Sequence, residues 1–483
     1  MKIQTIEISN YKAFHGKYEI MVGGKNLFIY GENGSGKSSL YYALKDFFQA
    51  SIEDIDLHAL ENIFISEDKK GSAAIKVTFK PGGQGRKGLQ SYQFSASVND
   101  SRSPTDTSIR DANKLKSFLT YKHLLVIHHL KKNDEINLFD LLVQGVLNHF
   151  KYSLTNGKEL GELWREVEDG IAKPTGREFP VSKKRVEVNA AIKSFNDAFG
   201  ELFKEDSPEY ILKHAKPILD RFNHNIQLKL RFSQVRPDAE YTALQGRQVH
   251  VELNYIGKKV ENPHLFLNEA RLSAIAISIY LGMIKRHVQG IPCKILFLDD
   301  IFIGLDIANR LPLLKILETE FPDYQIFITT YDKPWFEYAR GFLGKGWKTL
   351  EFYAQQTQEG FEIPHIFDDQ DLLAKAKYHL DNSDYKSTAV YARSAFEKII
   401  RDYCKEKKKK IAFKLRLKDY TTQDFWNEIV ADINPTTKTD IEQYRALVLN
   451  AFSHYNTEKH ELKTELEAAI HAVKALKSEL SSL

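Results

Sequence analysis

The sequence predicts an α/β domain with a short helical insertion, followed by an all-α domain. Two patterns predict the α/β domain: a buried strand that leads through a glycine-rich turn into a helix at 26–48, and an apolar strand at 294–298 that ends in two aspartates. A third pattern, helical periodicity throughout 366–483, predicts the second domain. We expect the boundary near Pro364–Asp369, so that the first domain covers 1–365.

The composition is that of a folded protein. Of 483 residues, 42% are hydrophobic and 27% are charged, which excludes a mainly disordered chain. The longest apolar run, Ser273 to Ile284, is too short to cross a bilayer and is expected to form a buried helix, so no membrane contact is expected. The N-terminus has no signal-peptide core, and Cys293 and Cys404 form no CxxC pair. We therefore expect a cytoplasmic protein without disulfides or structural zinc.

Alternation of apolar and polar residues, or short apolar runs, predict the strands of the first domain. The expected strands are 2–9, 17–22, 26–30, 73–79, 91–98, 123–127, 226–232, 249–255, 294–298, 325–329 and 349–353. Apolar residues at helical spacing predict helices at 37–48, 269–285, 308–320 and 458–480. A helical pattern without sustained heptads fills 139–222 and predicts a short lobe, and Gly82–Gly88 is expected to be a loop.

A phosphate-binding loop is predicted at residues 31–38, which read Gly-Glu-Asn-Gly-Ser-Gly-Lys-Ser and fit G-x-x-x-x-G-K-[ST]. Glycines in such a loop let backbone N–H groups turn toward phosphates. Lys37 would contact the β- and γ-phosphates of ATP, and Ser38 would ligate Mg²⁺. The residues expected to bind the nucleotide are Asn33, Gly34, Ser35, Gly36, Lys37, Ser38 and Ser39. The alternative is a glycine-rich turn that holds no ligand.

Asp299 and Asp300 end the second apolar strand. Carboxylates at the end of a buried strand are costly unless they meet a cation or hydrogen-bond donors. We expect Asp299 to hold Mg²⁺ through water, and Asp300 to be the catalytic group that polarises the attacking water. The alternative is an ordinary turn after a strand.

These two segments resemble the ABC-type ATPase heads of the SMC and RecF kind. Asn10–Phe14 with Asn26–Leu40 is similar to one half of such heads, and Ile295–Asp306 to the other, so the resemblance covers about 1–360. It implies a mixed sheet with a phosphate loop, and ATP held between two copies of the head. It also implies that Asp306 lies in a D-loop that positions the dimer partner.

The resemblance also implies positions at which this chain departs from the family pattern. A segment that contacts the partner's nucleotide, the trans signature, is implied at Leu267–Arg271, where Asn268, Glu269 and Ala270 replace the usual serine and glycines. Tyr331 stands where a switch histidine is usual, and Asp300 where a glutamate is usual. No confident Q-loop glutamine is found; His128 or His129 is nearest. A shorter acid displaces the base, so we expect slow or gated hydrolysis.

The insertion is too short for the long coiled coils of chromosome-organising SMC proteins. Residues 266–282 and 296–306 look like the stand-alone ATPases of prokaryotic anti-phage systems, namely PtuA of Septu, its retron-associated versions, and AriA of PARIS. This resemblance implies an ATP-dependent sensor or scaffold that dimerises, or forms a higher oligomer, and works with a separate HNH or TOPRIM nuclease or a toxin. The alternatives are a self-contained ATP-gated RNase and a RecF-like DNA repair ATPase.

The C-terminal domain contains a candidate RNase site. Arg393 and Glu397 lie at i and i+4 of one helix, and so do Asn450 and His454. An Arg that binds phosphate, a Glu that orients and a His that acts as general acid and base could cleave RNA without metal. The layout resembles HEPN-like domains and the anticodon nucleases PrrC and RloC, although Arg445 stands nine residues before the histidine instead of four to six. The alternatives are a salt bridge, a helix cap or a protein-docking surface.

Positive charge is concentrated in the C-terminal domain. Residues 401–418 contain nine basic and two acidic residues and carry +7, so the rest of the chain, with a total charge of +4, carries −3. Attraction to nucleic acid is therefore expected to be local. The alternative is a solvated helix end.

Overall fold

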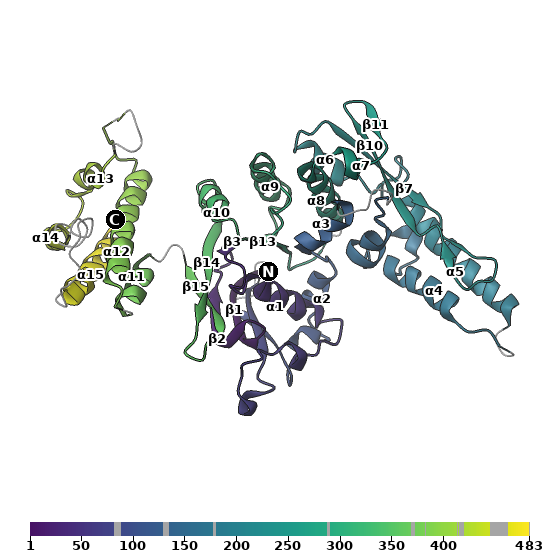
Figure 1. The fold of residues 1–483 in the computed structure, drawn as a ribbon, viewed down its shortest axis with the longest axis horizontal. Coiled ribbons are helices and arrows are strands. Elements are labelled where there is room, and N and C mark those ends of the chain that lie inside the picture. The colour runs from purple at the N-terminus through teal and green to yellow at the C-terminus, as the bar shows by residue number, and fades with distance from the viewer. Residues whose placement is uncertain are drawn as a thin grey trace. The chain divides into compact units, whose positions relative to one another are not determined.

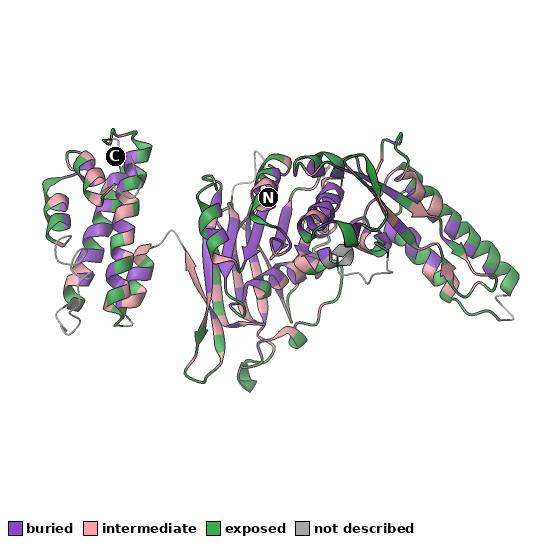
Figure 2. Cartoon of the chain, turned by 45° about the horizontal axis from the view of Figure 1, so that its top comes forward, coloured by how far each residue is buried: buried purple, intermediate pink, exposed green. Residues whose placement is uncertain are grey.

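A six-stranded sheet carries the predicted phosphate loop and the two aspartates (Figure 1). In spatial order its strands are β15 (Glu362–Asp368), β14 (Trp347–Gln356), β3 (Asn26–Gly31), β13 (Gln325–Thr330), β12 (Ile295–Asp299) and β6 (Phe118–Thr120). Neighbouring strands from β14 to β6 are parallel. Almost every residue of β3, β12 and β13 is buried, as in a parallel sheet that is covered on both faces (Figure 2).

A second, antiparallel sheet lies beside it and contributes the N-terminal strands. Its order is β2 (Phe14–Met21), β1 (Lys2–Tyr11), β4 (Ala74–Lys80) and β5 (Gln90–Ser95). Helix α1 (Lys37–Gln49) contacts β1 and β4 of this sheet and β12 of the other. The helix that follows the phosphate loop is therefore held between the two sheets, which fixes the loop relative to the end of β12.

A helical lobe with a small sheet separates the two halves of the site in sequence. It contains α4 (Leu160–Ala172), α5 (Val181–Glu201), α6 (Ala215–Asp220) and a sheet of β11 (Lys258–Val260), β10 (Gln248–Tyr255) and β7 (Ile226–Ser233). Buried aromatic rings hold it together; Phe139 lies 4.9 Å from Trp164, and Phe195 lies 5.3 Å from Phe199. The same hydrophobic core continues into α8 (Glu269–Arg286), so the lobe and the sheets share one interior.

The remaining elements of the first part are short or flank the sheets. They are α2 (Ser108–Asn113), α3 (Tyr121–His128), α7 (Pro263–Phe266), α9 (Ile307–Glu320), α10 (Lys333–Arg340), β8 (Arg236–Pro237), β9 (Leu244–Gln245), and the single turns His58–Leu60, Glu67–Lys69, Asp100–Arg102, Leu141–Val146 and Ser153–Thr155.

The predicted strand at 123–127 is wrong, because these residues belong to helix α3. The strand of this region is β6, which lies just before it and has only three residues. The neutral ring of His123 accepts a hydrogen bond from the Thr120 backbone N–H at 3.0 Å, where the chain leaves the strand. A short apolar run such as Leu124–Ile127 fits a buried helix as well as a buried strand, so periodicity alone did not separate them.

A partly buried ion-pair cluster gives a stability prediction. Glu159 contacts His149 Nδ1 at 2.6 Å and Lys114 Nζ at 2.9 Å. Burial alone would raise the pKa of Glu159, but these two partners outweigh it and lower the pKa to about 2. The cluster therefore stabilises the fold fully above the unfolded-state pKa near 4.5, and this contribution is lost as pH falls toward 2.

Glu159→Gln is expected to lower the free energy of unfolding at pH 7 by about 1–3 kcal/mol, because it removes the charge that both partners bind. Urea unfolding at several pH values measures this difference, which should shrink as pH falls below about 4.5. The matched control is Glu166→Gln, whose pair with Lys158 is about half exposed and should contribute less than about 0.5 kcal/mol. A pH-independent loss at Glu159 would contradict the assignment.

Residues 1–81, 88–128, 135–176, 180–286, 290–368, 372–381, 383–412, 414, 420–444 and 462–482 are described by this computed structural model. They divide into two units, Met1–His365 and Ile366–Leu483. Within the described ranges no helix is both long enough and apolar enough to cross a membrane. Most of the predicted loop at Gly82–Gly88 lies outside them.

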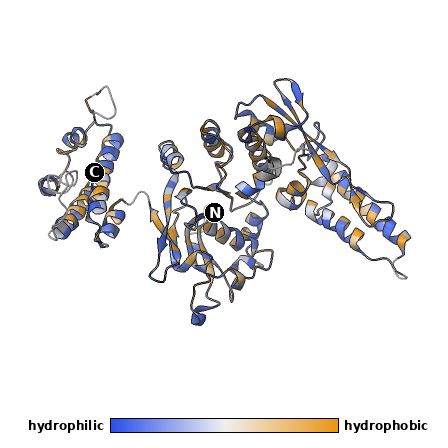
Figure 3. Ribbon diagram, viewed as in Figure 1, coloured by the Kyte–Doolittle hydropathy of each residue, from blue (hydrophilic) through white to orange (hydrophobic). Residues whose placement is uncertain are grey.

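After the last residues of β15, the described part of the second unit contains only helices. They are α11 (Leu372–Asp381), α12 (Tyr385–Glu406), α13 (Thr422–Ile429), α14 (Pro435–Tyr444) and α15 (Leu462–Ser482). The predicted stripe of α15 from Leu466 to Leu480 is buried against α12 and α14, and Figure 3 shows the apolar and polar sides of these helices. Residues 458–461 of the predicted final helix lie outside the described residues.

Candidate functional site

Residues 31–38 connect β3 to α1 in a loop that requires glycine. Gly34 and Gly36 have φ of +85° and +93°, a region that other residues rarely adopt. A Cβ on Gly31 would approach Ser35 Oγ to 2.5 Å, and one on Gly36 would approach Pro364 Cγ to 2.6 Å. No side chain caps α1, so its first backbone N–H groups remain available at the positive end of the helix. This is the geometry that binds an anion.

The side chain of Lys37 lies at the centre of this loop and is only 4% exposed. Its ammonium group donates to the backbone oxygens of Gly31 at 2.6 Å and Glu32 at 3.0 Å. Burial lowers the pKa of Lys37, while the carboxylates of Asp300 and Asp299 oppose that shift. Two of the three donors of Lys37 therefore fix its position, and the third remains for a ligand oxygen.

Asp299 and Ser38 meet although they are far apart in sequence. Ser38 Oγ donates to Asp299 Oδ2 at 3.1 Å, and Thr329 Oγ1 donates to Asp299 Oδ1 at 2.6 Å. Burial raises the pKa of Asp299, and these two hydrogen bonds oppose the shift. A hydroxyl and a carboxylate oxygen side by side are ligands that Mg²⁺ prefers. The two predicted Mg²⁺ ligands are thus adjacent.

Asp300 adopts a left-handed conformation, with φ of +52°. Its backbone N–H donates to Thr329 Oγ1 at 2.9 Å, so one threonine orients both aspartates. Its Oδ1 atom is buried and has no hydrogen-bond partner among the described residues. Burial raises the pKa of Asp300 to about 6, with Lys37 opposing the shift and Asp299 adding to it. A buried carboxylate with a raised pKa and an unused oxygen is suited to accept a proton.

Sequence reasoning missed Thr329. The signal was present, since β13 ends in two threonines and lies beside β12 in the sheet. A polar pair at the carboxyl end of a parallel strand reaches the same edge as the aspartates of the neighbouring strand.

The other predicted residues of the loop lie at its surface or behind it. Asn33 and Gly34 are exposed, whereas Ser35 is buried and its Oγ has no partner in the described structure. Ser39 Oγ accepts a hydrogen bond from the Ala13 backbone N–H at 3.4 Å. Ser39 therefore links α1 to the turn between β1 and β2.

The junction of β6 and α3 lies beside the two aspartates. Thr120 lies opposite Asp299 in the parallel pair of β6 and β12. The ammonium group of Lys122 acts to lower the pKa of Asp299. The side chain of His128 and all of His129, the candidates from sequence, lie outside the described residues. Lys122, at the start of α3, therefore lies near the aspartates.

The predicted trans signature forms the start of α8. Asn268 Oδ1 accepts a hydrogen bond from the Arg271 backbone N–H at 3.1 Å, so this side chain caps the helix. A Cβ on Gly304 would lie 2.4 Å from Ser273 Oγ and 3.6 Å from Glu269 Oε1. The signature helix and the loop that follows Asp300 are thus in close contact, and glycine at 304 permits it.

Asp306 begins α9 and is the cap of that helix. Its Oδ1 accepts from Asn309 N at 3.0 Å and from Asn309 Nδ2 at 2.7 Å. Arg310 donates to the Leu305 carbonyl oxygen at 2.7 Å and pairs with Asp332 at 2.6 Å. Tyr331, at the predicted switch position, precedes Asp332 and is 46% exposed. The predicted D-loop and switch segments are therefore joined through Arg310.

Aromatic rings from three distant segments gather beside the phosphate loop. Phe64 and Phe361 are stacked at 4.2 Å, and His15 contacts Phe361 edge-on at 5.2 Å. The strand after Phe361 reaches the loop, since Pro364 lies against Gly36. Phe64 is half exposed. We name His15, Phe64 and Phe361 the aromatic cluster; sequence reasoning did not find it.

The candidate RNase residues are only partly described. Arg393 Nε pairs with Glu397 Oε1 at 3.0 Å, and Thr422 Oγ1 of α13 donates to the same oxygen at 2.9 Å. His454 lies outside the described residues, as do Arg445 and Asn450. The structure therefore places the Arg and Glu of the predicted set together and leaves the histidine undescribed.

Part of the basic segment 401–418 is paired with acidic residues. Lys409 contacts Asp432, and Lys414 contacts Asp424, each at 2.6 Å. These pairs lower the net charge that this segment presents to a polyanion. Arg416 and Lys418 lie outside the described residues.

Comparison with known proteins places this fold in context. The family described as RecF/RecN/SMC N terminal domain matches residues 2–348. A crystal structure of the SmcHead bound to the C-winged helix domain of ScpA aligns with 13% identity and a TM-score of 0.41, covering 77% of this chain and 99% of that one. An Smc head with an extended coiled coil bound to the C-terminal domain of ScpA, derived from Pyrococcus furiosus, aligns with the same identity and TM-score over 79% and 99%. No curated protein matches.

Proposed function

The chain belongs to the RecF/RecN/SMC N-terminal domain family, and on that premise we propose that it binds ATP and Mg²⁺ at residues 33–39 and hydrolyses ATP slowly. One observation carries the proposal: Ser38, Thr329 and Lys37 converge on Asp299 and Asp300, although the two halves are 262 positions apart in sequence. The residues present fit the nucleotide, since the loop offers backbone N–H groups and the buried oxygens Ser35 Oγ and Asp300 Oδ1 have no hydrogen-bond partner within the described ranges.

Each side chain then has one task. Lys37 would bind the β- and γ-phosphate oxygens, and Ser38 with Asp299 would hold the metal. Mg²⁺, when bound, supplies positive charge to the phosphates. Asp300 Oδ1 would accept the proton of the attacking water, because no described residue hydrogen-bonds to it and the pKa of the Asp300 carboxyl is raised to about 6. Thr329 holds both aspartates through its hydroxyl and acts as a positioning residue.

We also propose that two copies of the head close around ATP, with Asn268, Glu269 and Ala270 of one copy facing the nucleotide of the other. Asp306 would lie at the contact, since it caps α9 next to the signature helix. The Asn268 side chain already caps α8, so it has less capacity to bind a partner's phosphate than a free serine would. This supports slow hydrolysis or hydrolysis gated by another event.

The family resemblance of the sequence favours a cytoplasmic sensor or scaffold of anti-phage defence that holds a partner nuclease or toxin through its helical unit. One structural observation favours the second candidate, an ATP-gated RNase: the Arg393–Glu397 pair is fixed by Thr422 of a neighbouring helix.

Incubation with total tRNA, with and without ATP–Mg²⁺, separates the two candidates when the His454→Ala protein is assayed in parallel. If the chain is a scaffold, neither protein should cleave tRNA. A nuclease or toxin should also co-purify with the chain from cells that carry the neighbouring genes. Site-specific cleavage that is lost in His454→Ala would contradict it and establish the RNase.

The aromatic cluster is expected to bind the adenine base. Phe64→Ala should weaken ATP binding about tenfold, because stacking of a base on an aromatic ring contributes about 1–3 kcal/mol. Titration calorimetry with a non-hydrolysable ATP analogue measures the change. Phe342→Ala is the matched control, since this exposed ring of similar accessibility lies after α10 and packs on Tyr338 instead of the aromatic cluster. Equal affinities for both variants would show that the base binds elsewhere.

A further inference from the structure

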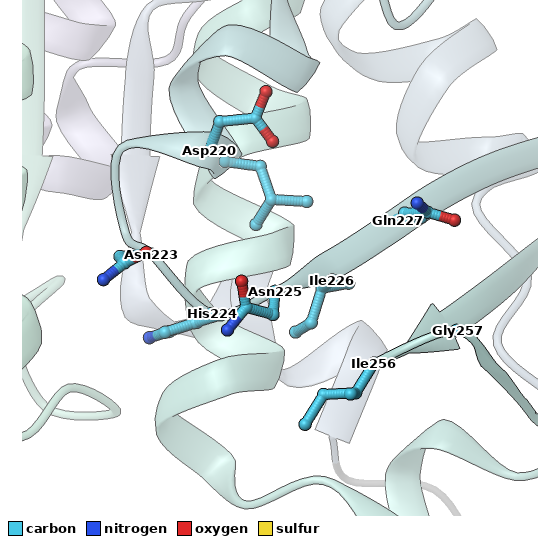
Figure 4. A pocket seen from close by; sticks show the side chains of 9 residues that line it. Asp220, Asn223, His224, Asn225, Ile226, Gln227, Ile256 and Gly257 are labelled. Atoms are coloured by element: carbon cyan, nitrogen blue, oxygen red, sulfur yellow. The ribbon is translucent and has the colours of Figure 1, made fainter.

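A pocket lies in the lobe, apart from the phosphate loop. Nine residues line a space of about 620 Å³, a size typical of small-molecule sites (Figure 4). They come from the end of α6, from residues 223–227 at the start of β7, and from the turn between β10 and β11. Asn225 and Ile256 enter it from different segments, which are joined by a backbone hydrogen bond from Ile256 N to Asn225 O at 3.3 Å.

The backbone of this pocket is held in an uncommon conformation. Asn223, Asn225 and Ile256 have φ of +55°, +53° and +51°. Asparagine tolerates this region, but a β-branched residue such as isoleucine adopts it at an energetic cost. Ile256 is also 67% exposed, so burial does not offset that cost.

The chemistry of the lining selects an uncharged ligand with hydrogen-bonding edges. Asn223, Asn225 and Gln227 provide amides, each with donors and an acceptor, and Asp220 provides a carboxylate that only accepts. None of the nine lining residues is Lys or Arg, so a phosphate is disfavoured. The exposed aliphatic side chain of Ile256 offers apolar surface, whereas Ile226 is only 6% exposed and belongs to the hydrophobic core. Amides match the edge of a nucleobase, and aliphatic groups pack on its faces.

His224 connects the pocket to the D-loop. Asn309 Nδ2 donates to the carboxylate of Asp306 at 2.7 Å, so the oxygen of the same amide faces His224. The His224 Nε2–H therefore donates to Asn309 Oδ1 at 2.7 Å. The other ring nitrogen, Nδ1, is buried and has no partner among the described residues. A ligand that touches His224 is thus two hydrogen bonds from Asp306.

We propose that this pocket binds a nucleobase, either of a free nucleoside or of a single-stranded nucleic acid, and that the guanine edge suits it best. Guanine presents two adjacent N–H groups, which the Asp220 carboxylate can accept, and an acceptor edge for the amides. The site is separate from the phosphate loop and does not depend on ATP binding there. An experiment can therefore contradict nucleobase binding in this pocket without contradicting ATP binding at the phosphate loop, and the reverse.

The test is equilibrium dialysis of guanosine, adenosine, cytidine and uridine against the full chain, with excess ATP–Mg²⁺ present to occupy the phosphate loop. Guanosine is expected to bind at sub-millimolar concentration. Asn225→Gly and Ile256→Gly should each weaken it about tenfold or more, the effect of one lost hydrogen bond or apolar contact of about 1.4 kcal/mol. Glycine favours a positive φ, so both variants keep the backbone while removing the side chain.

Asn156→Gly is the matched control, because Asn156 is also exposed and left-handed, with φ of +52°, and does not line the pocket. Competition by a short single-stranded RNA would show that a strand supplies the base, and absence of competition would show a free nucleoside. The proposal is overturned if neither nucleosides nor RNA bind, or if guanosine binds the two pocket variants as tightly as the control.

Discussion

Replacing Lys37 with alanine is expected to weaken ATP binding by about a hundredfold or more, and so to abolish every ATP-dependent activity of the chain. The substitution removes a buried cation whose position is fixed by Gly31 and Glu32 and whose remaining donor faces the phosphate position. A charge-assisted contact with a phosphate contributes about 3 kcal/mol, which corresponds to about a hundredfold in affinity. Titration calorimetry with a non-hydrolysable analogue and Mg²⁺ measures it.

Lys25→Ala is the control for this experiment, since Lys25 is an exposed lysine next to the start of β3. Its replacement should leave ATP affinity unchanged. The thermal unfolding of both variants should stay close to that of the wild type, because neither lysine fills the hydrophobic core. Unaltered ATP affinity in a folded Lys37→Ala protein would mean that residues 31–38 form only a glycine-rich turn.

Asp300→Asn is expected to lower the rate constant of ATP hydrolysis about 10²- to 10⁴-fold while ATP still binds, because an amide cannot accept the proton of water. The wild-type kcat/KM should also fall below about pH 6, where burial leaves Asp300 half protonated. Activity falls at low pH because the carboxylate must be charged to act as a base. Since the pKa of Asp300 is raised, this loss of activity occurs at a higher pH than it would for an ordinary aspartate. A phosphate-release assay across pH measures both effects.

Asp300→Glu tests the reason given for slow hydrolysis. The glutamate is longer by one methylene and would place its oxygen closer to the attacking water, so the rate should rise. The left-handed φ at this position disfavours glutamate and glutamine to the same degree. Asp300→Gln is therefore the control, because it has the length of glutamate without its charge. A rate in Asp300→Asn equal to that of the wild type would remove Asp300 from the mechanism.

The main fold class is confirmed, and the reason is that its signals are local. Residues 26–48 carry strand, turn and helix in one continuous segment, and the strand before Asp299 is a single apolar run. The family match over residues 2–348 agrees with this interpretation. The prediction of a strand at 123–127 was wrong because the actual strand, β6, has only three residues, too few to show an alternation of apolar and polar residues.

The features that sequence reasoning missed depend on contacts between distant segments. Thr329 orients Asp299 and Asp300 only because β13 lies beside β12. The aromatic cluster combines rings from positions 15, 64 and 361, and no spacing relates them. The hydrogen bond from His224 to Asn309 likewise joins the lobe to α9. Such contacts follow from strand order and packing, which a single sequence does not specify.

The most direct test of the central claim, an ATP-dependent head that closes on a second copy, is the mass of the Asp300→Asn protein in solution with and without ATP–Mg²⁺. Blocked hydrolysis should trap the closed state. Analytical ultracentrifugation is therefore expected to show a dimer or larger assembly of the Asp300→Asn protein only when ATP is present. The double variant, which carries Lys37→Ala as well as Asp300→Asn, is expected to form no such assembly with ATP. A mass that is identical with and without saturating ATP would contradict the account.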